Sequence, residues 1–137
     1  MPSLVTEPGF ADAATALAHF ERRLGVETDC SDVHESLKSD FDFVLVDVRG
    51  PKLYARGHVP RAINIPHRDM TAERMAAFPK DTAFVVYCAG PHCNGANKAA
   101  IRLARRPAFL DSFQPMIGRI PHHVGERILD EIEHLTV

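Results

Sequence analysis

Two short apolar runs constrain the fold of this chain more than any other feature of its sequence. Residues 41–48 read FDFVLVDV, and residues 82–88 read TAFVVYC. Both runs are apolar almost throughout and rich in β-branched residues, which is typical of strands buried on both faces of a sheet. Because such strands need helices to cover them, the runs predict an α/β fold with a parallel sheet.

The segments around these two strands alternate between helical and extended patterns. Two shorter strands are expected at 63–66 and 113–118. A short extended piece and a helix are expected within 27–39, with Ser31 or Asp32 as the helix N-cap. The other predicted helices lie within residues 11–24, 51–62, 70–79, 95–106 and 126–135. Ligands of parallel sheets bind beyond the carboxyl ends of the strands, and Cys88 stands at such an end.

Composition excludes several classes of protein. The length of 137 residues suits one domain with a single core. A net charge of -2 argues against nucleic acid as a partner, because phosphate binding needs a basic face. No apolar run approaches the roughly 20 residues that cross a bilayer, and the first ten residues do not resemble a signal peptide. We therefore expect no membrane association and a cytoplasmic location, where thiols stay reduced.

The segment from Cys88 to the next helix joins a thiol to a glycine-rich loop. Backbone N–H groups of such a loop, and of the helix start behind it, favour a nearby anion, so they lower the pKa of a thiol and create the nucleophilic thiolate. Gly90 and Gly95 let the backbone curl tightly, and Pro91 stiffens the curve. The alternative to this favoured interpretation is that Cys88 is a small core residue that ends a buried strand. Cys93 could be a second thiol, a resolving partner or a loop filler.

Counting along the loop tests three rival chemistries. A cysteine-dependent phosphatase needs Arg six positions after its cysteine, where this chain has Asn94 after Cys88 and Ala99 after Cys93. A thioredoxin-like pair has two residues between its cysteines, and this chain has four. Zinc could recruit Cys88, Cys93 and His92, completed by His122 and His123, but no second ligand pair has finger or ribbon spacing. No metal or other cofactor is expected.

Three stretches, in this order, resemble the rhodanese family of single-domain sulfurtransferases. The first, FVLVDVRGPKLYARGHVPRAINIP at 43–66, is the most specific of the three. The second is FVVYC at 84–88, which is similar to the family's strand that ends at the catalytic cysteine, and the third is FQPMIG at 113–118. The resemblance implies a three-layer α/β/α domain with a central five-stranded parallel sheet. We assign residues 27–137 to this domain and residues 1–26 to an N-terminal helical extension, which either covers the sheet edge or forms a homodimer contact.

The resemblance also implies a function for the cysteine loop. Cys88 would accept a sulfane sulfur as a persulfide and pass it to a thiol or protein acceptor, with thiosulfate or a persulfide as donor. Asp47 and Arg49 would support the loop, and His58 and Pro60 would shape a turn. The loop itself comprises Ala89, Gly90, Pro91, His92, Cys93, Asn94 and Gly95.

Departures from the family pattern leave alternatives open. The loop is about two residues longer than usual and carries no Arg or Lys before Lys98, which favours a protein persulfide or a small thiol over thiosulfate. Charge could come from Lys98, Arg49, Arg119 or His92. Cys93 could be the nucleophile in place of Cys88, whereas Cys30 is expected to be a small buried residue. The alternative functions are a non-catalytic interaction or regulatory module and an arsenate or phosphate enzyme on the same fold.

Overall fold

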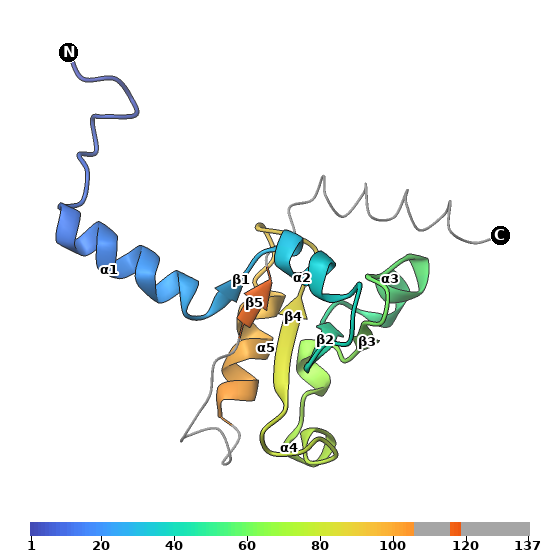
Figure 1. Ribbon diagram of the computed structural model, residues 1–137. Helices are drawn as coiled ribbons and strands as arrows, with labels where there is room; N and C mark the ends of the chain where they lie inside the picture. The colour runs from blue at the N-terminus through green and yellow to red at the C-terminus, as the bar shows by residue number, and fades with distance from the viewer. Residues whose placement is uncertain (106–115, 119–137) are drawn as a thin grey trace.

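A sheet of five strands runs through the centre of the computed structural model, which describes residues 1–105 and 116–118 (Figure 1). Along the sheet the order is β1-β5-β4-β2-β3, and every pairing is parallel. The predicted α/β class with a parallel sheet is confirmed. The strands are β1 (Glu27–Thr28), β2 (Phe43–Asp47), β3 (Ile63–Asn64), β4 (Ala83–Tyr87) and β5 (Met116–Gly118).

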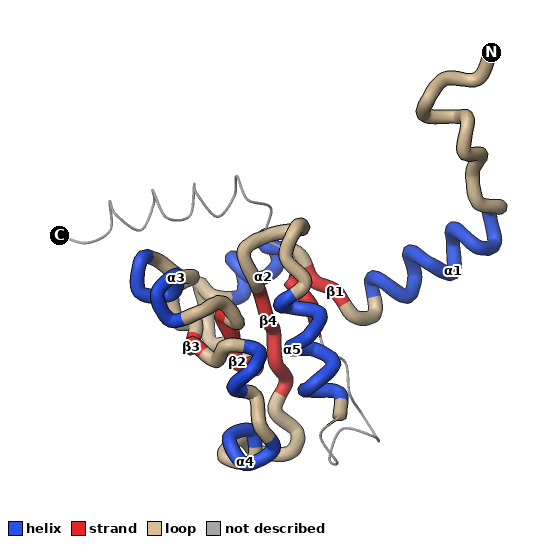
Figure 2. The backbone as a smooth tube through the Cα atoms, turned by 180° about the vertical axis from the view of Figure 1, so that it is seen from behind, coloured by secondary structure: helices blue, strands red, loops and turns tan. Residues whose placement is uncertain are grey.

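The two faces of the sheet carry separate apolar clusters, because side chains of a strand alternate between faces. On one face, Val46 of β2 and Phe84 and Val86 of β4 pack against α5 (Gly95–Ala104). Helix α5 brings small side chains to this contact, which lets it lie close to β4 (Figure 2). On the other face, Leu45 and Val85 pack with Val33. Helices thus cover both faces of the sheet.

The remaining helices are short, and two of them differ from the prediction. α2 (Cys30–Ser36) is capped by Asp29, whose side chain accepts a hydrogen bond from the Asp32 amide, so the expected cap at Ser31 or Asp32 was wrong. The helix within 70–79 is reduced to α4 (Ala72–Met75), because Thr71 caps it late and the chain turns before Pro79. The others are α3 (Pro51–Arg56) and the 3-10 turn η1 (His67–Asp69). The predicted helix at 126–135 lies outside the described residues.

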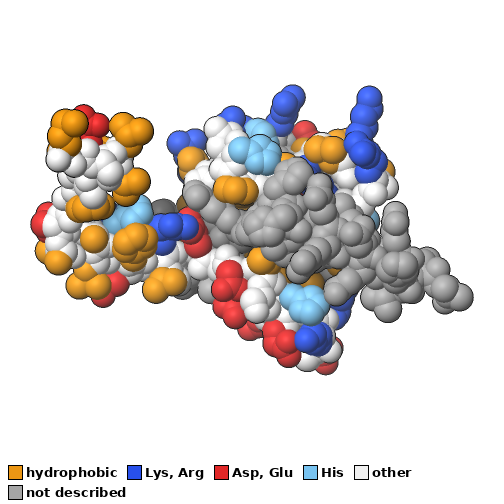
Figure 3. Space-filling view, turned by 90° about the horizontal axis from the view of Figure 1, so that it is seen from above, with side chains coloured by type: hydrophobic (Ala, Val, Ile, Leu, Met, Phe, Trp, Pro, Cys, Tyr) orange, Lys and Arg blue, Asp and Glu red, His pale blue; other side chains and the backbone are white. Residues whose placement is uncertain are grey.

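The N-terminal helix α1 (Ala13–Leu24) points away from the sheet (Figure 1). Asp12 caps it by accepting a hydrogen bond from the Thr15 amide. No residue of α1 is buried, so the expectation that this helix covers the sheet edge does not hold. Its apolar side chains, with those of the preceding arm, form the exposed orange region of Figure 3. No helix within residues 1–105 is both long and apolar enough to cross a membrane.

Candidate functional site

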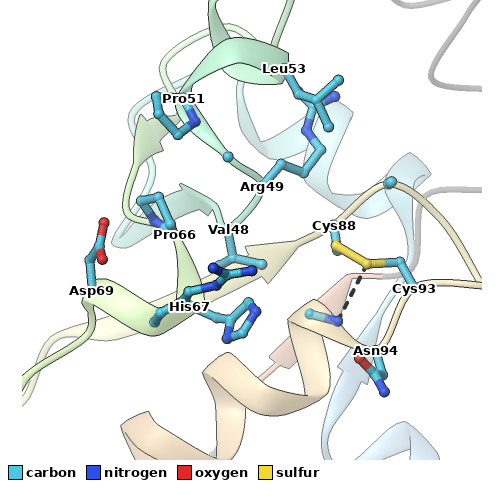
Figure 4. A pocket seen from close by; sticks show the side chains of 14 residues that line it. Val48, Arg49, Pro51, Leu53, Pro66, His67, Asp69, Cys88, Cys93 and Asn94 are labelled. Carbon is cyan, nitrogen blue, oxygen red and sulfur yellow. Dashed lines mark hydrogen bonds between the residues drawn. A yellow bond between two sulfur atoms is a disulfide. The ribbon is translucent and has the colours of Figure 1, made fainter.

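A pocket of about 510 Å³ opens where β2, β3 and β4 end (Figure 4). Three loops form its wall: the one after β2, the one after β3 that contains η1, and the cysteine loop after β4. The pocket therefore occupies the position expected for ligands of a parallel sheet. The lining residues are Val48, Arg49, Gly50, Pro51, Leu53, Pro66, His67, Arg68, Asp69, Cys88, Ala89, Cys93, Asn94 and Gly95.

A tight turn folds the cysteine loop back on itself. The Cys93 amide donates a hydrogen bond of 3.0 Å to the Gly90 carbonyl, which closes a four-residue turn with Pro91 in its second position. Gly90 has φ of 142°, a conformation that other residues rarely adopt. The turn returns Cys93 to Cys88, and their Sγ atoms are joined in a disulfide. The structure thus contains the oxidised form of the pair.

Gly95, the first residue of α5, lies against both sulfur atoms. A Cβ atom added to Gly95 would lie 2.7 Å from the Cys88 Sγ and 3.4 Å from the Cys93 Sγ. The Gly95 amide donates a hydrogen bond of 3.4 Å to the Cys93 Sγ, drawn as a dashed line in Figure 4. Only glycine leaves room for the pair at this position, and its N–H group supplies a donor that stabilises negative charge on sulfur.

Asp47 and Arg49 form a partly buried ion pair beside the pocket. Asp47 is fully buried, and its carboxylate accepts hydrogen bonds from the Arg49 amide and guanidinium, with a shortest N···O distance of 2.6 Å. This hydrogen bonding raises the pKa of Arg49 above its ordinary value. The Arg49 Nη2 also donates to the Gly57 carbonyl. Arg49 therefore lines the pocket, whereas Asp47 lies behind it.

Tyr87 completes this network from β4. Its hydroxyl donates a 2.8 Å hydrogen bond to the Asp47 carboxylate and accepts one from the Val59 amide. Burial raises the pKa of Tyr87 far above its usual range, so the hydroxyl stays protonated and remains a donor. The side chain of Asn64 bonds the carbonyls of Asp47 and Arg49, which ties the end of β3 to the loop after β2. The pocket wall is thus held by a polar network of four side chains.

Sequence reasoning missed the part of the pocket wall that follows β3, which includes His67 and Arg68, and it also missed the lining residues Val48, Gly50, Pro51, Leu53, Pro66 and Asp69. Within the described residues, the buried Nδ1 of His67 has no hydrogen-bond partner. Burial, followed by the positive charges of Lys98, Arg68 and Arg102, lowers the pKa of His67, against the opposing charge of Asp69. His67 and Arg68 directly follow Pro66 beyond the end of β3, which was the signal available in the sequence.

Other predicted residues lie outside the pocket or outside the described chain. Gly90, Pro91 and His92 of the cysteine loop do not line the pocket. Lys98 is an exposed residue of α5, and Arg119, His122 and His123 lie outside the described residues. Cys30 is a free cysteine and only half-buried, so its expected burial was wrong.

The predicted turn residue His58 contacts Tyr54 of α3. His58 stacks on the Tyr54 ring at 3.6 Å and its Nδ1 lies 2.9 Å from the Tyr54 carbonyl, a contact that holds the turn after α3. Throughout the described part of the chain, no group of three His, Cys, Asp or Glu side chains is placed to hold a metal ion.

Comparison with known proteins places these features in a family. The family model of the rhodanese-like domain matches residues 29–113. The HTH-type transcriptional regulator Rv0324 of Mycobacterium tuberculosis is 38% identical over 104 residues, which are 74% of this chain and 44% of that protein. A sulfurtransferase of Allochromatium vinosum is 36% identical over 62 residues, 45% of this chain and 57% of that protein. The chain thus spans about half the length of these relatives.

Solved structures share the fold. The BH2092 protein of Bacillus halodurans superposes with a TM-score of 0.71 and 28% identity, over 85% of this chain and 82% of that one. The rhodanese-like domain of the Anabaena protein Alr3790 superposes with a TM-score of 0.55 and 21% identity, over 77% of this chain and 74% of that one. The family match covers the sheet strands β2, β3 and β4, the pocket and the cysteine loop, and the chain belongs to the rhodanese-like domain family.

Proposed function

We propose that this chain is a sulfurtransferase in which Cys88 carries a sulfane sulfur as a persulfide. The observation that carries the proposal is the position of Cys88 at the end of β4, inside the pocket and beside the first turn of α5. Sulfur chemistry needs a thiolate with an open approach and nearby donors, and this position offers both. The relative in Allochromatium vinosum that is named a sulfurtransferase supports the same activity.

The proposed transfer has two steps. The Cys88 thiolate attacks the sulfane sulfur of the donor, a new S–S bond forms, and the donor leaves with the electron pair, as sulfite if the donor is thiosulfate. The thiolate of the acceptor then attacks the outer sulfur, and Cys88 leaves as a thiolate. The backbone N–H groups of the loop, which Pro91 lacks, would stabilise the charge on the persulfide, with Arg49 as a neighbouring cation. The first step needs Cys88 as a free thiolate rather than as part of the disulfide, which fits a cytoplasmic location.

The charges of the pocket favour a persulfide donor over thiosulfate. Arg49 is already paired with Asp47, and the charge of Arg68 is opposed by the adjacent Asp69 in the same wall. A dianion such as thiosulfate therefore gains little net attraction here. The apolar side chains of Val48, Leu53 and Pro66 in the wall suit the carbon part of a thiol-borne persulfide.

A regulatory module is the second candidate. The Mycobacterium tuberculosis relative is named a transcriptional regulator, and the part of it that matches this chain is less than half of its length. In this alternative the domain would bind a partner and would need no reactive thiol. An arsenate or phosphate enzyme has less support, because the loop lacks the Arg that clamps the oxyanion.

Intact-protein mass after loading with sulfur separates these functions. Reduced, desalted protein is incubated with thiosulfate and, separately, with a low-molecular-weight persulfide. Cys93→Ser is expected to gain one sulfur atom, and the double variant Cys88→Ser/Cys93→Ser to gain none. Cys30→Ser, which removes the free cysteine of α2, serves as the matched control and is expected to load like the wild type. If the reduced Cys93→Ser protein accepts sulfur from neither donor, the regulatory module becomes the better explanation.

A further inference from the structure

We infer that Cys93 is a built-in acceptor that discharges the persulfide of Cys88 as hydrogen sulfide and leaves the Cys88–Cys93 disulfide. This inference rests on the proposed function and goes beyond it, because it gives the same site a second outcome. Sulfur either passes to an external thiol or leaves as sulfide when no such thiol is present. The disulfide of the structure is then the end state of the second route.

The fold brings the two cysteines together without any rearrangement of the core. Their Cα atoms are 6.4 Å apart, within the range that a disulfide spans. The turn closed between Gly90 and Cys93 fixes this approach, and α5 begins only two residues after Cys93. Cys88 packs against the apolar cluster between the sheet and α5, which fixes its position, and Cys93 approaches it from the loop.

Gly95 favours Cys93 as the attacking thiolate. Its amide, at the N-terminus of the ten-residue helix α5, donates a hydrogen bond to the Cys93 Sγ. A donor at this place stabilises the deprotonated form of the thiol, and only the thiolate attacks sulfur. The absent Cβ of Gly95 leaves the space in which both sulfur atoms meet. Gly95 therefore acts as a positioning residue for this step.

The reaction balances within the protein. The Cys93 sulfur attacks the Cys88 Sγ, the bond between that Sγ and the sulfane sulfur breaks, and the sulfane sulfur leaves with the electron pair. It takes the proton of the persulfide and the proton that Cys93 gives up, and so leaves as hydrogen sulfide. The sulfane sulfur is reduced by two electrons, which come from the two thiols as they form the disulfide. A dithiol reductant then returns the pair to the reduced form.

Two thiols, one external and one from Cys93, can therefore attack the same persulfide. An external thiol attacks the outer sulfur and leaves Cys88 reduced and ready for another cycle. Cys93 attacks the inner sulfur and leaves the pair oxidised until a dithiol arrives. The rate of the internal attack determines the lifetime of the Cys88 persulfide, and so the time in which an external thiol can react with it. Because the disulfide must be reduced before the next cycle, turnover by the internal route depends on the concentration of dithiol reductant.

A single-turnover experiment tests this inference. Protein is reduced, desalted without oxygen, loaded with one equivalent of cysteine persulfide and desalted again, after which intact mass and free sulfide are followed in time. The wild type and the control Cys30→Ser are expected to release about one sulfide per loaded chain and to end two hydrogen atoms lighter than the reduced protein. Peptide mapping should then find the Cys88–Cys93 disulfide. Cys93→Ser and, as a second variant, Cys93→Ala should keep the sulfur, with release slowed at least tenfold.

Two outcomes would contradict the inference, and they differ in what they imply for the proposed function. A wild type that keeps its persulfide as long as Cys93→Ser does would overturn the inference and leave the proposed function standing. If neither Cys93 variant gains sulfur although the wild type becomes oxidised, the disulfide arises without a persulfide on Cys88, and both the inference and the proposed function fail.

Discussion

Gly95 packs so closely against Cys88 that a Cβ atom added to Gly95 would lie 2.7 Å from the Cys88 Sγ. The first residue of the helix and the last residue before the loop are thus in direct contact, although seven positions separate them in sequence. This contact places the sulfur of Cys88 beside the first residue of α5, whose amide donates a hydrogen bond to the Cys93 Sγ.

Gly95→Ala is expected to destabilise the oxidised protein. An alanine is ordinarily better than glycine in a helix, but here its methyl group meets a sulfur atom that the disulfide holds in place. We expect a loss of about 1–3 kcal/mol in the free energy of unfolding, measured by urea denaturation, and a smaller loss after reduction, when Cys88 can turn aside. Gly25→Ala at the end of α1 is the control, because an added Cβ there meets its nearest atom at 3.5 Å. An oxidised Gly95→Ala protein as stable as the wild type would contradict this close contact.

Asp47→Asn is expected to be among the most damaging substitutions in the chain. It leaves the half-buried Arg49 guanidinium facing a neutral amide and changes the partner of the Tyr87 hydroxyl. Because Arg49 keeps partial access to solvent, removing the Asp47 charge is expected to cost about 1–3 kcal/mol, which chemical denaturation would detect. Glu35→Gln, which breaks the exposed pair with Lys38 on α2, is the control and should leave stability unchanged. Equal effects of the two substitutions would mean that the network around Asp47 contributes no more to the free energy of unfolding than an exposed ion pair does.

Arg68→Gln is expected to slow sulfur uptake from thiosulfate more than uptake from a persulfide. Arg68 is an exposed cation in the wall of the pocket that holds Cys88, so its charge attracts a donor dianion more than a donor of lower charge. A screened interaction of roughly 0.5–1 kcal/mol corresponds to a two- to fivefold lower loading rate with thiosulfate, and added salt should reduce the difference. Arg74→Gln on α4, outside the pocket, should load at the wild-type rate. If Arg68→Gln slows both donors equally, Arg68 acts through the shape of the wall and not through its charge.

The parts of this molecule that follow from local sequence were predicted, and those that depend on strand pairing were not. The apolar β-branched runs predicted β2 and β4, and the Gly and Pro residues predicted the turn that carries Cys93. The Tyr87–Asp47 hydrogen bond was missed because it depends on the register that sets these two residues opposite each other in neighbouring strands. His67 was missed for a related reason: it enters the pocket only because β3 pairs beside β2.

The same placement of His67 makes stability depend on pH. Its folded-state pKa is lowered, first by burial and then by the charges of Lys98, Arg68 and Arg102, while the unfolded chain titrates near 6.5. As pH falls through 6.5 toward the lower folded pKa, the unfolded state binds the proton first, so the free energy of unfolding decreases. The contribution of His67 is therefore complete above pH 6.5 and is lost below it.

Thermal unfolding at pH 7.5 and pH 5.5 measures this dependence. Protonation would also leave a buried Nδ1–H of His67 without an acceptor among the described residues, which adds to the cost of the charged form. His67→Gln cannot take up a proton, so we expect its melting temperature to fall less than that of the wild type between the two pH values. His34→Gln, an exposed position on α2, should follow the wild type. A His67→Gln protein with the full wild-type decrease would show that other groups cause the pH dependence.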